Sequence, residues 1–150
     1  MIVACPACQK KNRLPVERLA QSPTCGACGK PLLEGVLSLD ASALSELTQK
    51  PTNAQAGSLP VIVDFWAPWC GPCQQFAPTF TAAAKQHGGR MVFAKIDTEA
   101  HQSVAVAHQI RSIPTLMVFH HGQSIQRVSG ALAPAALAQL VSQVFTQTKA

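Results

Sequence analysis

The sequence predicts an α/β fold: a mixed central sheet with helices on both faces, preceded by a small cysteine-rich extension. After residue 34, strand-like and helix-like segments alternate in the order βαβαβαββα. The last two strand-like segments flank His120-His121-Gly122-Gln123, which is typical of a hairpin. Four of the six cysteines lie before residue 34, namely Cys5, Cys8, Cys25 and Cys28. We therefore expect an extension over residues 1–34 and a main domain over residues 35–150.

The first strands of the main domain are short and apolar. Val36–Leu39 predicts a strand, and Asp40 can cap the helix that follows. Residues 50–59 contain several Pro, Gly, Asn and Ser residues, which predict a loop. Pro60–Trp66 is apolar and β-branched apart from Asp64, a pattern that favours a central buried strand.

The second half shows helical periodicity more clearly. Apolar residues spaced by three and four predict a helix from Cys73 that ends at Gly88-Gly89, with a kink at Pro78. The remaining predictions are a strand over Met91–Ile96, a helix over Ala100–Gln109, strands over Thr115–Phe119 and Ser124–Val128, and a helix that begins near Pro134. We expect the early strands to be parallel and the final hairpin to be antiparallel.

Composition limits the class of protein. The chain is 47% hydrophobic and carries a net charge of +5, so it can form a packed core. No apolar run is long enough to cross a bilayer, and the amino terminus lacks the pattern of a secretory signal. We therefore expect a cytoplasmic protein with no membrane contact, in a compartment where disulfides are usually catalytic. We also expect a monomer without an organic cofactor.

Cys70-Gly71-Pro72-Cys73 follows a predicted strand and opens a predicted helix. A thiol at a helix amino terminus has a lowered pKa, because free N–H groups and the helix dipole favour the thiolate. Cys70 is thus the candidate nucleophile, and Cys73, one helical turn later, is the candidate resolving thiol. The alternative is that the two cysteines are half of a metal site, but a strand–helix junction is an unusual place for one.

The segment from Val61 to Cys73 closely resembles the active-site segment of the thioredoxin family. The resemblance continues through Lys95, Ile113-Pro114-Thr115 and Gly130 and covers roughly residues 36–150. It implies the thioredoxin fold and reduction of protein disulfides, with recharging by an NADPH-dependent thioredoxin reductase. One departure is Gln74, where many thioredoxins carry lysine, and its neutral side chain should slightly reduce support for the thiolate.

The resemblance also assigns roles around the dithiol. It implies that Asp64 is a buried carboxyl that accepts or relays the proton of Cys73, with Lys95 as its charge partner. A structural carboxylate and an ordinary strand lysine are the alternatives. The resemblance further implies a cis peptide bond before Pro114. It implies a substrate-binding surface formed by Trp69, Gly71, Pro72, Ile113, Pro114 and Thr115.

The amino-terminal cysteines form two C-x-x-C pairs separated by 16 residues. This spacing indicates a site of four cysteine ligands for one structural Zn²⁺. Two disulfides are disfavoured in a reducing compartment. A second redox dithiol is also disfavoured, because we predict no strand before either pair. The whole chain then resembles the zinc-ribbon-bearing thioredoxins of the thioredoxin 2 type, and oxidation of the zinc site is a possible route to a role in oxidative stress.

Two other functions compete with the enzyme. The basic residues Lys10, Lys11 and Arg13 suggest nucleic-acid binding. However, residues 1–34 contain no aromatic side chain, and the basic charge can balance an anionic zinc–thiolate cluster. A holdase or assembly factor could use the same surface without turnover. Replacement of Cys70 separates these functions, because only the enzyme depends on that thiol.

Overall fold

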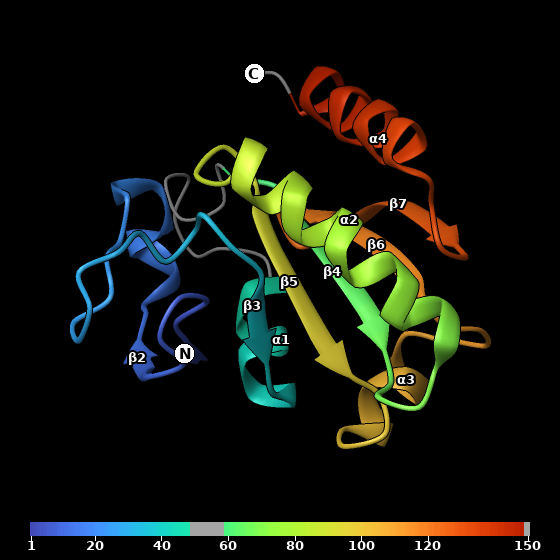
Figure 1. Cartoon of the computed structure of the whole chain (residues 1–150), viewed down its shortest axis with the longest axis horizontal. Helices are drawn as coiled ribbons and strands as arrows, with labels where there is room; N and C mark the ends of the chain where they lie inside the picture. The colour runs from blue at the N-terminus through green and yellow to red at the C-terminus, as the bar shows by residue number, and fades with distance from the viewer. Residues whose placement is uncertain (49–58, 149–150) are drawn as a thin grey trace.

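The computed structural model describes residues 1–48 and 59–148, so the loop predicted over residues 50–59 lies outside the described residues apart from Leu59. A five-stranded mixed sheet runs through the main part of the chain (Figure 1). β5 pairs in parallel with β3 and β4, whereas β6 is antiparallel to β4 and β7. In spatial order the strands are β3 (Leu37–Leu39), β5 (Val92–Asp97), β4 (Val61–Trp66), β6 (Thr115–His120) and β7 (Gln123–Ser129).

Helices cover both faces of this sheet, as predicted (Figure 1). Side chains alternate along a strand, so Ile62 of β4 faces one layer and Val63 faces the other. The Ile62 face packs against α2 (Gly71–His87) and α4 (Pro134–Gln147). The Val63 face packs against α1 (Ala41–Thr48) and α3 (Gln102–Ala107). Among the described residues, no helix is both long and apolar enough to cross a membrane.

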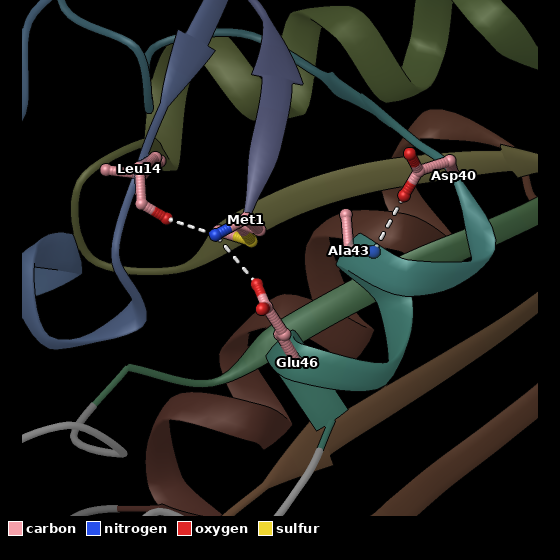
Figure 2. A network of polar contacts seen from close by, with 5 residues as sticks. All are labelled: Met1, Leu14, Asp40, Ala43 and Glu46. Carbon is pink, nitrogen blue, oxygen red and sulfur yellow. Dashed lines mark hydrogen bonds and ion pairs between the residues drawn. The ribbon is translucent and has the colours of Figure 1, made fainter.

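Local hydrogen bonds explain where two of the helices begin. Asp40 Oδ1 accepts the backbone N–H of Ala43 at 2.7 Å, which confirms the predicted cap of α1 (Figure 2). α3 is shorter than the predicted Ala100–Gln109 helix. Asp97 Oδ1 accepts the N–H groups of Glu99 and Ala100, at 2.9 and 3.2 Å, and so forms a turn before the helix.

The hairpin is tighter than the predicted four-residue connection. β6 and β7 extend to His120 and Gln123, so only His121 and Gly122 form the turn. Both residues have positive φ angles, of 52° and 77°, as two-residue hairpin turns that match the sheet twist require. Within α2, Pro78 lies inside a continuous helix, and the kink there stays a prediction.

The amino-terminal extension shares its core with the main domain. It contains the antiparallel strands β1 (Ile2–Ala4) and β2 (Lys11–Arg13) and the 3-10 helix η1 (Val16–Gln21). The prediction of no strand before either cysteine pair was therefore wrong for Cys5, because β1 is only three residues long and has little periodicity to detect. A turn, and no helix, follows Cys5. The extension adds several buried residues to the cluster on the α1 face of the sheet, including Val3, Leu14, Leu19, Leu32 and Leu33.

Close contacts hold the extension against the rest of the molecule. β1 lies next to β3, the edge strand of the main sheet. The amino group of Met1 contacts Glu46 Oε2 of α1 at 2.7 Å and the Leu14 carbonyl at 3.2 Å (Figure 2). A Cβ atom at Gly35 would lie 2.5 Å from Pro6 Cβ, and one at Gly88 would clash with the Leu33 carbonyl. At these two positions, the extension and the main domain are packed too tightly to accept a Cβ atom without movement.

Candidate redox site and cysteine cluster

Cys70 and Cys73 are joined by a disulfide where β4 leads into α2. Cys70 is the N-cap residue of α2, with an extended backbone, and Pro72 lies in the first turn. Proline suits this position because a backbone N–H in the first turn of a helix has no partner within the helix, so its absence costs no hydrogen bond. The Cys73 N–H donates to Cys70 Sγ at 3.2 Å. In the reduced protein, the same N–H and the helix dipole would stabilise a thiolate on Cys70.

Asp64 and Lys95 lie on the sheet face that α2 covers. The two residues are register partners in β4 and β5, and each shares its face with a core residue that packs on α2, Ile62 and Phe93 respectively. Because α2 starts just after β4 and packs back on the strand, its first turn lies over the carboxyl end of β4. The fold therefore brings the Asp64 side chain beneath the helix that begins at the dithiol.

The environment of Asp64 is unfavourable for a negative charge. The residue is 4% exposed, and its Oδ1 atom has no hydrogen-bond partner among the described residues. Burial raises the pKa of Asp64 to about 7, although the positive charge of Lys95 lowers it. A buried carboxyl whose pKa lies near neutrality can both hold and release a proton at physiological pH.

Lys95 connects Asp64 with Trp66. Its Nζ atom lies 4.9 Å from the centre of the Trp66 ring, a cation–π distance. Trp66 in turn packs, partly buried, against Ala67, Cys70 and Cys73. Lys95 thus touches the wall of the dithiol site and acts electrostatically on Asp64.

The segment before β6 lies on the other side of the dithiol. The Ile113–Pro114 peptide bond is cis, as predicted. The Ile113 carbonyl oxygen lies 3.8 Å from Cys70 Sγ and has no other polar partner within the described residues. Thr115 is buried and pairs with Phe65 and Ser129 inside the sheet, so the unpaired carbonyl at this site belongs to Ile113.

The surface around the dithiol is apolar and open. Trp69 is 68% exposed, and Gly71 and Pro72 are also exposed. Aromatic side chains are enriched in protein–protein interfaces. The sulfur of Cys70 thus lies beside the Ile113 carbonyl, and the residue before it carries an exposed indole, an arrangement that suits an extended peptide chain.

The four cysteines of the extension form one cluster. Their Sγ atoms all lie within 4.8 Å of one another, and the closest pairs are Cys5–Cys28 at 3.7 Å and Cys8–Cys25 at 3.6 Å. A tetrahedral zinc–thiolate site with bonds of about 2.3 Å has sulfur–sulfur edges of about 3.8 Å. The sulfur atoms of a disulfide are only about 2 Å apart, and all four cysteines are free. The donor set and its spacing therefore fit one zinc ion and exclude disulfides here.

Comparison with known proteins assigns the family. Residues 46–143 match the family model described as thioredoxin, and residues 4–30 match the zinc-ribbon model described as thioredoxin 2, N-terminal. Thioredoxin C-3 of Corynebacterium nephridii is 44% identical over 98% of this chain and 97% of its own length. The chain belongs to the thioredoxin family.

Further relatives and solved structures agree with this assignment. Thioredoxin 1 of Synechococcus elongatus is 42% identical over 69% of this chain and 95% of its own length. The structure of a mutant thioredoxin from Halobacterium salinarum is 30% identical and superposes with a TM-score of 0.62, covering 74% of this chain and 91% of that one. This chain is thus a thiol–disulfide oxidoreductase with a thioredoxin fold and an amino-terminal ribbon of four close cysteines.

Two further residues of this thioredoxin contribute to the sites, and sequence reasoning missed both roles. The side chain of Gln74 donates to the Pro68 carbonyl at 2.6 Å and so closes the turn that carries Cys70. From the sequence, Gln74 is notable only because it stands where many thioredoxins carry a positively charged lysine. Its hydrogen bond could not be predicted, because it depends on the geometry of the turn.

Asn12 is the second such residue. Its Nδ2 donates to Cys25 Sγ at 3.4 Å, and its Oδ1 accepts the Gly26 N–H at 2.9 Å. Hydrogen bonds lower the pKa of Cys25 to about 6. The largest effect comes from the N–H of Cys28, followed by the Asn12 side chain and the N–H of Ala27. An amide residue between two C-x-x-C pairs could have suggested a link between them, but its position on β2 could not be predicted.

Proposed function

We propose that this thioredoxin is a protein-disulfide reductase in which Cys70 attacks the substrate and Cys73 resolves the intermediate. The observation that carries the proposal is the Cys70–Cys73 disulfide at the start of α2, beside the free carbonyl of Ile113. The substrate chain would bind along Ile113, Pro114 and Thr115 and against Trp69, Gly71 and Pro72. Gly-Pro between the two cysteines is typical of the reducing members of the superfamily.

The exchange proceeds in two steps. The Cys70 thiolate attacks one sulfur of the substrate disulfide, forms a mixed disulfide and releases the other substrate sulfur as a thiolate, which takes a proton from solvent. Cys73 then loses its proton, attacks Cys70 Sγ and releases the second substrate sulfur as a thiolate, which is protonated in turn. The substrate gains two electrons, and the protein ends as the Cys70–Cys73 disulfide.

Asp64 would assist the second step. An ionised Asp64 beneath the first turn of α2 can accept the Cys73 proton, directly or through water. The pKa of about 7 that burial imposes on Asp64 suits this task, because the carboxyl exchanges a proton readily at neutral pH. Lys95 would keep part of the Asp64 population ionised through its positive charge.

An NADPH-dependent thioredoxin reductase would return the disulfide to the dithiol, as the family generally uses this partner. We further propose that the protein is a monomer and works in the cytoplasm. The proposed zinc site supports this location, because its four cysteine ligands must stay reduced.

The test is a coupled assay with NADPH, thioredoxin reductase and insulin as the disulfide substrate. We expect turnover by the wild-type protein and at least about a 1,000-fold loss for Cys70→Ser, because serine is a far weaker nucleophile at neutral pH. Undiminished reduction by the Cys70 variant would contradict the assignment of the nucleophile. A folded wild-type protein that reduces no protein disulfide would favour a holdase or assembly role.

We also propose that the extension binds one structural Zn²⁺ through Cys5, Cys8, Cys25 and Cys28. The sulfur spacing supports this, as do N–H donors to sulfur from Ala7 and Ala27, both at 3.3 Å. When bound, the ion would balance the thiolate charge and hold the two C-x-x-C turns together. The boundary near residues 34–35 stays part of this proposal.

Oxidation of the four thiolates would release the zinc, loosen the ribbon and alter the rate of disulfide reduction. The shared core supports such coupling. A groove of about 720 Å³ also connects the two parts, with Pro6 and Gln9 on one side and Lys85 and Lys95 on the other. Peroxide treatment should release zinc and change the reductase rate in parallel, and an unchanged rate after complete zinc loss would refute the coupling.

A further inference from the structure

Arg127 of β7 contacts two backbone carbonyl groups just after α3. Its Nη1 donates to the His108 carbonyl at 2.7 Å, and its Nη2 donates to the Gln109 carbonyl. These bonds cross from the sheet to a loop 18 and 19 positions away in sequence. Two donors of one rigid guanidinium thus bind two consecutive carbonyls.

The chain just after α3 gains from such a partner. The carbonyls of His108 and Gln109 follow the last helical residue, and a cation near the carboxyl end of a helix is favourable. Gln109 has a φ angle of 55°, so the chain turns sharply there and leaves the helix. The His108 ring is held between Phe65 and Phe119, with centroid distances of 5.5 and 5.7 Å. Arg127 therefore completes a fixed starting point for the segment that follows.

That segment leads directly to the dithiol. It runs from His108 to Pro114, where the Pro114 carbonyl accepts the Gly130 N–H at 2.8 Å. Both ends of the segment are thus attached to β7 or to the residue just after it, one through Arg127 and the other through Gly130. Ile113, whose free carbonyl lies 3.8 Å from Cys70 Sγ, is located between these two attachments.

We propose that Arg127 is a positioning residue that holds residues 108–114 in place for the binding of extended protein substrates. A protein chain that pairs with the backbone near Ile113 needs this segment in one conformation, and disorder there would reduce affinity by the cost of ordering it. A small disulfide that reaches only Cys70 does not need the segment. The inference rests on the proposed reductase function, because it concerns the same substrate site.

The experiment compares Arg127→Ala with the wild-type protein on two substrates. For insulin, the variant should raise KM about fivefold and keep kcat within about twofold. For the small aromatic disulfide DTNB, the rate of the reduced protein should stay within about twofold. Amide hydrogen exchange at residues 110–113 should become faster. Arg127→Lys keeps the charge and can make one of the two bonds, so its KM should lie between those of the wild type and the alanine variant.

Gln126→Ala is the matched control. Gln126 is the neighbouring β7 residue, and its side chain donates to Gln147 of α4 at 3.0 Å on the opposite face. This control loses a β7 side-chain bond but leaves residues 108–114 untouched, so its KM for insulin should match the wild type.

Three results would overturn the proposal: an unchanged KM and exchange rate in Arg127→Ala, equal losses for insulin and DTNB, or an equal rise of KM in Gln126→Ala. A wild-type protein that cannot reduce insulin would instead refute the reductase function, and with it this inference. If Arg127→Ala folds poorly, Arg127→Lys and the exchange measurement decide, since a lysine variant with wild-type KM and exchange rates would also refute the role of the paired bonds.

Discussion

The C-x-x-C motif occurs three times in this chain and takes two different structures. Cys70 and Cys73 lie at a strand–helix junction, where the helix turn brings their sulfur atoms together in a disulfide. The cysteines of the extension lie on short turns, and each sulfur meets one from the other pair at 3.6–3.7 Å. The same two-residue spacing thus supports bond formation within a pair in one place and a four-sulfur cluster in the other.

The comparison teaches that the backbone around a thiol decides its chemistry. In both regions, backbone N–H groups donate to sulfur and favour the thiolate. At the helix N-terminus, however, Cys70 follows the exposed Trp69 and lies beside the Ile113 carbonyl. In the ribbon, the Sγ atoms of the three other cysteines lie within 4.8 Å of each sulfur. A metal cation is the natural partner for such a cluster.

Cys25→Ser should have the largest effect, because it removes one thiolate from the ribbon and leaves the redox site unchanged. The zinc affinity should fall on the order of 1,000-fold, since one of four thiolates is lost from a site whose total binding free energy is about 10–16 kcal/mol. The variant should still form the Cys70–Cys73 disulfide. A chromogenic chelator measures the amount of zinc per protein and so tests the ribbon. A count of free thiols after mild oxidation tests whether the Cys70–Cys73 disulfide still forms. Full zinc occupancy in Cys25→Ser, or zinc loss in Cys70→Ser, would show that the two regions are not separate sites.

Asp64→Asn tests the environment of the redox site through the pH dependence of protein stability. The pKa of Asp64 is raised by burial to about 7 in the folded protein, from 3.8, so between these values the folded state binds more protons than the unfolded state. Wild-type stability should therefore fall as the pH rises through this window, by up to about 4 kcal/mol in total. The asparagine variant lacks this titration, so its stability relative to the wild type should grow by that amount from pH 4 to pH 8.

Urea unfolding of the oxidised proteins at several pH values measures this difference. Glu17→Gln is the control, because it also removes one carboxylate, but from an exposed position. A pH-independent difference between Asp64→Asn and the wild type would mean that Asp64 has an ordinary pKa in the folded protein. The asparagine variant should also resolve mixed disulfides more slowly, since it cannot accept the Cys73 proton.

Much of the main domain could be predicted because its signals are local. Asp64 alone interrupts an apolar strand, Asp40 precedes an amphipathic stretch, and both lie where the pattern placed them. The start of α3 could not be predicted, because the Asp97 side chain binds the N–H groups of Glu99 and Ala100 and holds these residues in a turn before the helix. Local periodicity does not reveal a side chain that caps a turn.

The extension could be predicted only in part. The cysteine spacing indicated one cluster, and the four sulfur atoms do converge. The sequence could not indicate that Val3 and Leu14 join the core of the main domain, since their partners are distant in the chain. The hydrogen bonds of Asn12, Gln74 and Arg127 were missed for the same reason. Each depends on how two segments meet, which periodicity and spacing do not encode.

Gly88→Ala tests the contact between the two regions. A Cβ atom at Gly88 would clash with the Leu33 carbonyl, at the end of the extension, and with the Ala84 carbonyl of α2. The substitution should cost about 1–3 kcal/mol, because backbone atoms must move to accept it. Thermal unfolding measures the loss, and Gln86→Ala, an exposed change in the same helix, should alter stability by less than about 0.5 kcal/mol. A stable Gly88→Ala protein would mean that the extension can shift away from α2 at little cost.

The smallest expected effect concerns the hydrogen bonds around the ribbon sulfurs. Asn12→Ala removes the donor to Cys25 Sγ and the acceptor of the Gly26 N–H, so the zinc affinity should fall about tenfold, as is usual when a hydrogen bond to a metal ligand is lost. Asn12→Asp separates the two bonds. It keeps the acceptor but places a negative charge beside a thiolate, so it should bind zinc more weakly than the alanine variant. Competition with a chelator of known affinity measures the zinc affinity of the wild type and of the two Asn12 variants. Lys11→Ala, an exposed change on the same strand, is the control. If Asn12→Asp binds zinc as tightly as the wild type, the donor to Cys25 contributes nothing, and the backbone N–H groups alone hold the ribbon thiolates.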